Sequence, residues 1–162
     1  MKVSFAPLSF NHAAALSQYT GIDFMHSDFE DEDRWFCCSV ADGDRLGAVI
    51  VFEFKTWFDA HVSLVVFDPK ALSRKLISTL VTAVFRRAKR ISALVDANNM
   101  RALRQVWRLG FKHEGFIRLG IEGQRDAVMF GMLPDDCPYL KGEPFRFKVI
   151  TPTHEAPHGL VS

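Results

Sequence analysis

The chain has 162 residues, with 20 Lys and Arg against 19 Asp and Glu, so its formal net charge is +1. This balance excludes a uniformly basic nucleic-acid arm, and 48% hydrophobic with 24% charged residues is typical of a globular domain. The three cysteines have no CxxC spacing, which excludes a zinc ribbon and favours a reducing compartment. Because neither a signal peptide nor a membrane-spanning run is visible, we expect a cytoplasmic protein with no membrane partner.

The first 70 residues predict one helix followed by strands. Residues 11–19 are rich in alanine and begin with Asn11, a favourable N-cap, so we expect a short helix that ends near Gly21. Residues 28–34 form an acidic run that we interpret as a solvated loop. Three runs rich in apolar and aromatic residues then predict a β-hairpin and a further strand, over residues 35–40, 46–54 and 61–67.

The next elements alternate between helix and strand. Apolar residues spaced by three and four from Ser73 to Arg90 predict an amphipathic helix. A short strand over residues 91–95 follows, which makes a βαβ unit whose strands are parallel or neighbouring. A second helical pattern covers residues 100–109 and stops at Gly110. Two antiparallel strands are expected last, over residues 111–119 and 126–133.

This order of elements predicts a mixed α/β (α+β) domain with one central sheet of six or seven strands, mostly antiparallel, flanked by about four helices. No internal repeat is visible, and no composition shift is strong enough to split the chain. We therefore expect a single domain over residues 1–135 and an irregular C-terminal extension over residues 136–162, where prolines are frequent.

Positive charge is concentrated in the middle of the chain. Residues 70–112 hold 11 of the 20 basic side chains and a single acid, Asp96. Such a block indicates either a face that meets an anion or a solvated helix surface. Within the block, a helix begins at Ser73-Arg74-Lys75, and the unpaired N–H groups of a first turn can hold phosphates. We interpret this junction as a candidate anion site, with a plain helix start as the alternative.

The second predicted helix carries a family motif. Asn99 is followed by Ala102, by Val106 and by Leu109-Gly110-Phe111. This pattern, with Glu114-Gly115-Phe116 after it, resembles the fourth-helix motif of the GNAT N-acetyltransferase superfamily. Residues 123–133 look like the closing hairpin of that fold, particularly in the branch that acetylates ribosomal-protein N-termini and related amines. The resemblance covers about residues 1–135 and implies a GNAT-like domain with one splayed parallel pair of strands.

The resemblance implies an acetyl-CoA-dependent N-acyltransferase whose cofactor lies between the strand over residues 61–67 and the strand that begins at Ile91. The backbone of the first strand would pair with the pantetheine arm, the following loop and helix start would take the pyrophosphate, and the next helix would flank the arm. The cofactor-binding residues expected on this basis are Leu64, Val65, Val66, Leu72, Ser73, Arg74, Lys75, Leu76, Ile77, Asn99 and Ala102.

Two departures from the family pattern affect this site. The pyrophosphate loop of the family is rich in glycine, whereas Ser73, Lys75 and Ile77 occupy the corresponding positions here. Because phosphate approaches a backbone most easily where there is no Cβ, we expect weaker or shifted cofactor binding, with Arg74 and Lys75 as compensating cations. Many members also use a helical tyrosine as the general acid, and its position here is Val106.

Three residues are candidates for the chemistry. His61 is the leading general base because its ordinary pKa lies near neutral pH, Ser63 shares its strand face and could orient a water, and Glu53 is a second base candidate, with Glu114 behind it. The histidines form no metal-binding spacing, so we expect no metal. The adjacent thiols of Cys37 and Cys38 lie in a predicted apolar strand, where we expect them to be inert.

Three functions compete at this stage. The first is an N-acetyltransferase that moves the acetyl group of acetyl-CoA to a primary amine of a small molecule or a protein N-terminus. The second is a catalytically degenerate protein of the same fold that acts as a binding or regulatory module. The third, a nucleic-acid-binding surface, is disfavoured by the pI near 7.8. The acidic run at 28–33 favours a cationic acceptor, and the 15 Phe residues leave room for a homodimer.

Overall fold

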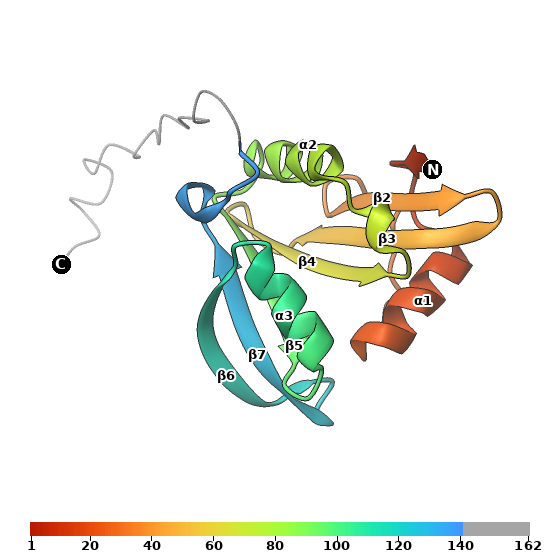
Figure 1. The fold of residues 1–162 in the computed structure, drawn as a ribbon. Coiled ribbons are helices and arrows are strands. Elements are labelled where there is room, and N and C mark those ends of the chain that lie inside the picture. The colour runs from red at the N-terminus through yellow and green to blue at the C-terminus, as the bar shows by residue number, and fades with distance from the viewer. Residues whose placement is uncertain (141–162) are drawn as a thin grey trace, which may run out of the picture.

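The computed structural model describes residues 1–140, which form one sheet with helices packed on both faces (Figure 1). The strands in this part of the chain are β1 (Lys2–Ser4), β2 (Trp35–Asp42), β3 (Arg45–Phe54), β4 (Asp59–Val66), β5 (Arg90–Asp96), β6 (Lys112–Ile121) and β7 (Arg125–Met132). The helices are α1 (Phe10–Thr20), α2 (Arg74–Phe85) and α3 (Met100–Arg108), with short 3-10 helices η1 (Pro69–Ala71) and η2 (Pro134–Asp136). None of these helices is long and apolar enough to cross a membrane.

The sheet confirms the predicted fold class. Its strand order is β1-β2-β3-β4-β5-β7-β6, and within the described residues β4 and β5 are the one parallel pair. All other neighbours are antiparallel. Strand β1 was not predicted, because three residues with mostly exposed side chains give no periodic signal.

Each face of the sheet has its own core. Helices α2 and α3 cover one face, where Phe85, Val84 and Ile91 are buried with side chains of β3, β4, β5 and β7. Helix α1 and residues 22–35 cover the other face, where Leu16 and Trp35 are buried. A single sheet residue therefore faces either the α2–α3 side or the α1 side, and this decides which cavity it lines.

Two helix boundaries differ from the prediction. The N-cap of α1 is Ser9, not Asn11: the Ser9 hydroxyl accepts from the His12 N–H, and His12 Nδ1 accepts from the Ser9 N–H. Helix α2 ends at Phe85 rather than near Arg90, because the N–H groups of Lys89 and Arg90 both donate to the Phe58 carbonyl and lead the chain into β5. The described residues form three α-helices, whereas about four were expected.

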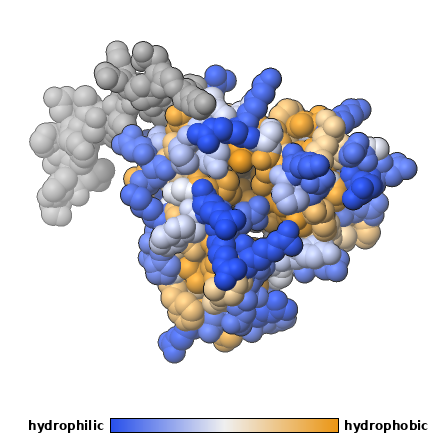
Figure 2. All heavy atoms as spheres, viewed as in Figure 1, coloured by the Kyte–Doolittle hydropathy of each residue, from blue (hydrophilic) through white to orange (hydrophobic). Residues whose placement is uncertain are grey.

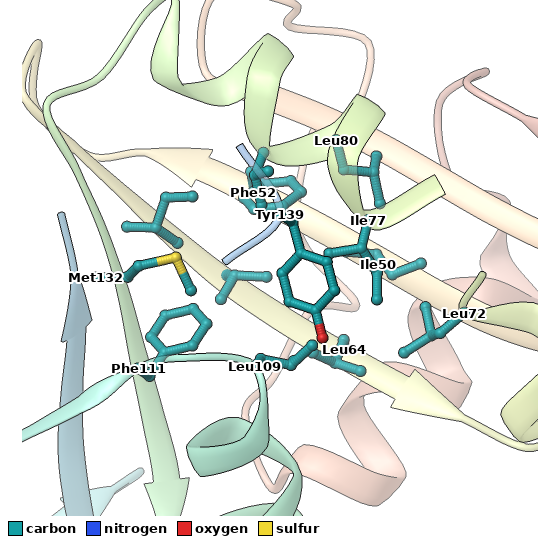
Figure 3. A pocket seen from close by; sticks show the side chains of 13 residues that line it. Ile50, Phe52, Leu64, Leu72, Ile77, Leu80, Leu109, Phe111, Met132 and Tyr139 are labelled. Carbon is teal, nitrogen blue, oxygen red and sulfur yellow. The ribbon is translucent and has the colours of Figure 1, made fainter. Parts of the chain in front are cut away.

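Residues 134–140 close the α2–α3 face. Cys137 is buried in its core, and Tyr139 and Leu140 pack against the same cluster. The Tyr139 ring enters an apolar cavity of about 50 Å³, where its hydroxyl points between Leu64 and Leu109 (Figure 3). Most of the extension expected over residues 136–162 lies outside the described residues.

Candidate active site

The two parallel strands separate after a short pairing. Their register covers only Asp59–His61 on β4 and Arg90–Ser92 on β5. Beyond this point β4 remains paired with β3 on one edge, and β5 remains paired with β7 on the other. Because backbone groups alternate along a strand, the peptide groups of Leu64 that face β5 are left without a partner on that strand. The fold therefore opens a gap in the middle of its sheet.

A cavity of about 80 Å³ occupies this gap. Its walls include Ser63 and Leu64 from β4, Leu94 from β5, Asn99 at the N-cap of α3, and Ala102 from α3. Three of the predicted cofactor-binding residues, Leu64, Asn99 and Ala102, thus lie together at the splay. Val106, which stands where the family has a tyrosine, also lines this cavity.

A wide cleft of about 620 Å³ lies between the start of α2 and the side of α3 that carries its arginines. The predicted residues Val66, Leu72 and Ile77 line it, and Gln105 lines both this cleft and the splay cavity. Its cations come from α3, in the form of Arg101, Arg104 and Arg108. In the space-filling view, orange atoms lie in a depression between α2 and α3, and blue side chains border it (Figure 2).

The start of α2 holds the predicted residues Ser73, Arg74 and Lys75, none of which is among the residues that line this cleft. The Ser73 hydroxyl accepts the Leu76 N–H at 3.1 Å, and the N–H groups of Arg74 and Lys75 precede the first intrahelical bond, as the first amides of any helix do. The Arg74 guanidinium donates to the Pro138 carbonyl at 3.3 Å and lies 5.2 Å from the centre of the Tyr139 ring. The Lys75 side chain is exposed, whereas Val65 and Leu76 are buried in the two cores.

The three predicted catalytic residues line a third cavity, of about 480 Å³, on the α1 face. Glu53 on β3 is directly opposite His61 on β4, and Ser63 follows His61 on the same face. Ser63 also lines the splay cavity, so the two cavities adjoin. Phe24 and Trp35 form the aromatic part of the wall, with their ring centres 6.4 Å apart.

His61 is an uncharged imidazole at neutral pH. Its pKa is lowered from 6.5 to about 4, mainly by burial and to a smaller extent by the nearby Lys55, while Asp59 opposes the shift. Its Nδ1 atom lies 3.3 Å from the hydroxyl of Ser92 on β5, at the last paired position of the two strands. We expected His61 to be a base with an ordinary pKa, but its pKa is lowered in the structure because the side chain is desolvated. His61 can accept or donate a hydrogen bond here but does not carry a charge.

Charged groups surround this imidazole in compensated pairs. One Glu53 carboxylate oxygen lies 3.5 Å from Arg34 and 3.9 Å from Lys55. Asp59 pairs with Arg90 at 3.4 Å, and Arg90 also pairs with Glu114, which was considered behind Glu53 as a base. Glu114 is not among the residues that line the third cavity.

Asn99 has a local structural role as well as its place at the splay. Its side-chain oxygen accepts the Ala102 N–H at 3.1 Å and caps α3. Three residues earlier, Asp96 accepts the Asn98 N–H and pairs with Arg125 at 3.0 Å, and these bonds hold the pKa of Asp96 below its usual range. The loop between β5 and α3 is thereby fixed against β7. The cap uses the side-chain oxygen of Asn99 and leaves its NH₂ group without a hydrogen bond to any described residue.

The fold was compared with solved structures. A chimeric spermidine N-acetyltransferase, in part from Vibrio cholerae, has a TM-score of 0.62 at 15% identity over 87% of this chain and 100% of the other. The Bacillus subtilis acetyltransferase in complex with CoA gives 0.59 at 14% identity over 82% and 97%. The Vibrio fischeri ribosomal-protein-S5-alanine acetyltransferase gives 0.57 at 14% identity over 83% and 94%. The chain has the GNAT acetyltransferase fold.

This result confirms the fold that the Asn99–Phe111 motif predicts. No family model and no curated protein matches the sequence. The GNAT fold explains why the cavities lie where they do, since they follow the splay of its parallel pair and the helix after β5. The residue roles inherited from the resemblance stay predictions.

Sequence reasoning missed two parts of the site in this GNAT fold. The first is the arginine set of α3, although the spacing of Arg101, Arg104 and Arg108 by three and four residues places them on one helix face. The second is Ser92, whose exposed fraction is 2%. A polar residue inside an otherwise apolar strand could have indicated this position.

Proposed function

We propose that the protein is an N-acyltransferase that moves the acetyl group of acetyl-CoA to a primary amine, of a small molecule or a protein N-terminus, by direct attack in a ternary complex. The observation that carries the proposal is the row of three cavities through the sheet. The wide cleft that Arg101, Arg104 and Arg108 line, here called the arginine cleft, adjoins the splay cavity at Gln105. The splay cavity in turn adjoins the third cavity at Ser63 and Leu94. A long anionic ligand fits from the first cleft, with its far end at the third cavity.

The donor side of this row fits the chemistry of CoA. Arg101, Arg104 and Arg108 supply positive charge for the phosphates, in place of a glycine-rich loop. The backbone of Leu64 presents unpaired groups to the amides of the pantetheine arm, and Asn99 flanks it from α3. When bound, acetyl-CoA supplies an acetyl group that is activated as a thioester.

The acceptor side supplies a place for the reaction. The amine nitrogen attacks the thioester carbonyl carbon, the carbon–sulfur bond breaks, and the proton that the amine loses balances the proton that the thiolate gains. Holding the two reactants in the right geometry is worth roughly 7–11 kcal/mol of the barrier. We assign His61 to orienting the amine or a water through a hydrogen bond, Ser63 to the same water, and Glu53 to the proton of the ammonium.

The charges of the third cavity favour a positively charged acceptor. Of the three carboxylates that line it, Glu53 is paired with Arg34 and Lys55, and Asp59 is paired with Arg90. Glu122 has no ion pair among the described residues and accepts the Asp23 N–H, so its negative charge attracts an ammonium, the form that an alkylamine takes at neutral pH.

Calorimetric titration with acetyl-CoA and with CoA tests the donor site. We expect micromolar binding, and we expect Arg101→Glu and Arg104→Glu to weaken it by at least about tenfold each, because an ionic hydrogen bond is worth about 1.5–3 kcal/mol. The matched control is Arg45→Glu, at the exposed start of β3. Absence of binding at millimolar cofactor would refute the proposal.

Turnover is then measured as release of free CoA thiol with a panel of small amines and basic peptides. Acetylation of any of these amines supports the enzyme. Cofactor binding without turnover across the panel would instead favour the alternative of a catalytically degenerate binding module.

A further inference from the structure

The outer face of α3 carries an exposed tryptophan. Trp107 has 66% of its surface exposed. It lines a groove of about 420 Å³ between α3 and the β6–β7 hairpin, whose other walls include the apolar side chains of Leu103, Val128 and Phe130. The groove thus offers one large flat ring and an apolar floor to a ligand from solvent.

This groove borders the arginine cleft. Arg104 and Arg108 line both hollows, so they form the ridge of α3 between them. His113 lies at the far wall, with its ring edge-on to Phe130 at 6.1 Å between the ring centres. A ligand that leaves the cleft over α3 therefore meets two guanidinium groups first and an aromatic surface next.

We infer that the adenosine end of the donor crosses α3 over Arg104 and Arg108, and that its adenine ring packs against Trp107 in this groove. The inference rests on the proposed function, because the donor is acyl-CoA. An adenine nucleotide combines phosphates with a flat aromatic base, which are the two chemistries that the ridge and the groove present side by side. Stacking of a base on an aromatic side chain is favourable for every base, since each has a π face.

The charge of this surface argues against a second copy of the chain as the occupant. A symmetric contact through Trp107 would bring the cations Arg104 and Arg108 of one molecule against the same cations of the other. Like charges opposed across an interface are unfavourable. An anionic ligand turns the same charges into attraction.

The test compares two donors that differ only in the adenosine 3′,5′-bisphosphate end. Calorimetry measures the dissociation constants of acetyl-CoA and of S-acetyl-4′-phosphopantetheine for the full chain. We expect Trp107→Ala to weaken acetyl-CoA binding about tenfold and to change phosphopantetheine binding less than about twofold. Trp107→Phe should restore most of the affinity. Trp57→Ala, at another exposed tryptophan, is the matched control and should change neither constant.

The outcomes separate the two proposals. If the wild type binds acetyl-CoA and Trp107→Ala leaves its dissociation constant unchanged, the groove is not the adenine site and the proposed function stands. An equal loss for both donors also overturns the inference, because it shows a general change in α3. If Trp107→Ala changes only the oligomeric state in size-exclusion chromatography, the groove is an interface between copies. If the wild type binds neither donor, the proposed function fails and this inference with it.

Discussion

The lowered pKa of His61 predicts how the stability of the protein depends on pH. The folded-state value is about 4, against 6.5 for an ordinary histidine. Between these two pH values the unfolded chain binds more protons at this histidine than the folded chain does. The contribution of His61 to the free energy of unfolding is therefore fully present above the upper value and is lost as the pH decreases through this window. From neutral pH to about pH 5, this one group lowers the free energy of unfolding by about 2 kcal/mol, since one pKa unit is worth about 1.4 kcal/mol.

The variant His61→Gln isolates this contribution because its side chain does not titrate. We expect the urea-unfolding free energy of the wild type to fall by about 2 kcal/mol more than that of the variant between neutral pH and about pH 5, since all other groups titrate in both proteins. His26→Gln, at an exposed position, is the matched control and should behave like the wild type. Equal pH dependence in the wild type and His61→Gln would refute the assignment of His61 as a desolvated, neutral imidazole.

Three further substitutions test the frame of the site. Asn99→Ala removes the cap of α3 and should lower the free energy of unfolding by about 1 kcal/mol in urea, whereas Asn99→Asp should keep it; equal losses would contradict the cap. Gly110→Ala places a Cβ 2.8 Å from Pro138 at a φ of +99°, so we expect a loss of about 1–3 kcal/mol, and an unchanged melting temperature would argue against the contact. Phe85→Ala should cost about 3–5 kcal/mol, because the ring is fully buried, while Phe10→Ala, at 74% exposure, should cost less than about 0.5 kcal/mol; similar effects would contradict this core.

The sequence was sufficient to predict the elements whose apolar residues recur at the spacing of a buried face. The three- and four-residue spacing of apolar side chains predicted α2 and α3, and Gly110 marked the end of α3 with its positive φ. The cap of α1 was misplaced because His12 takes the role that Glu or Gln usually has in a capping box.

The site was less predictable, because its cations are placed by tertiary contacts. Arg74 lies at the predicted helix start, but its guanidinium meets a carbonyl 64 residues further along the chain. The arginines of α3 line the cleft because α3 and the start of α2 lie on the same face of the sheet, on opposite sides of this cleft. The desolvation of His61 likewise depends on neighbours from several strands, which no local pattern records.

The short parallel pairing also bears on how cooperatively the domain folds. Three residue pairs join β4 to β5, against seven between β3 and β4 and six between β5 and β7. The sheet is therefore two well-bonded halves that meet at a thin backbone seam, and such a seam can open locally at a lower free energy than global unfolding. A donor bound between β4 and β5 would supply hydrogen bonds that link the two halves. Binding would then couple the two halves into one cooperative folding unit, and slow amide exchange would extend from each half across the whole sheet.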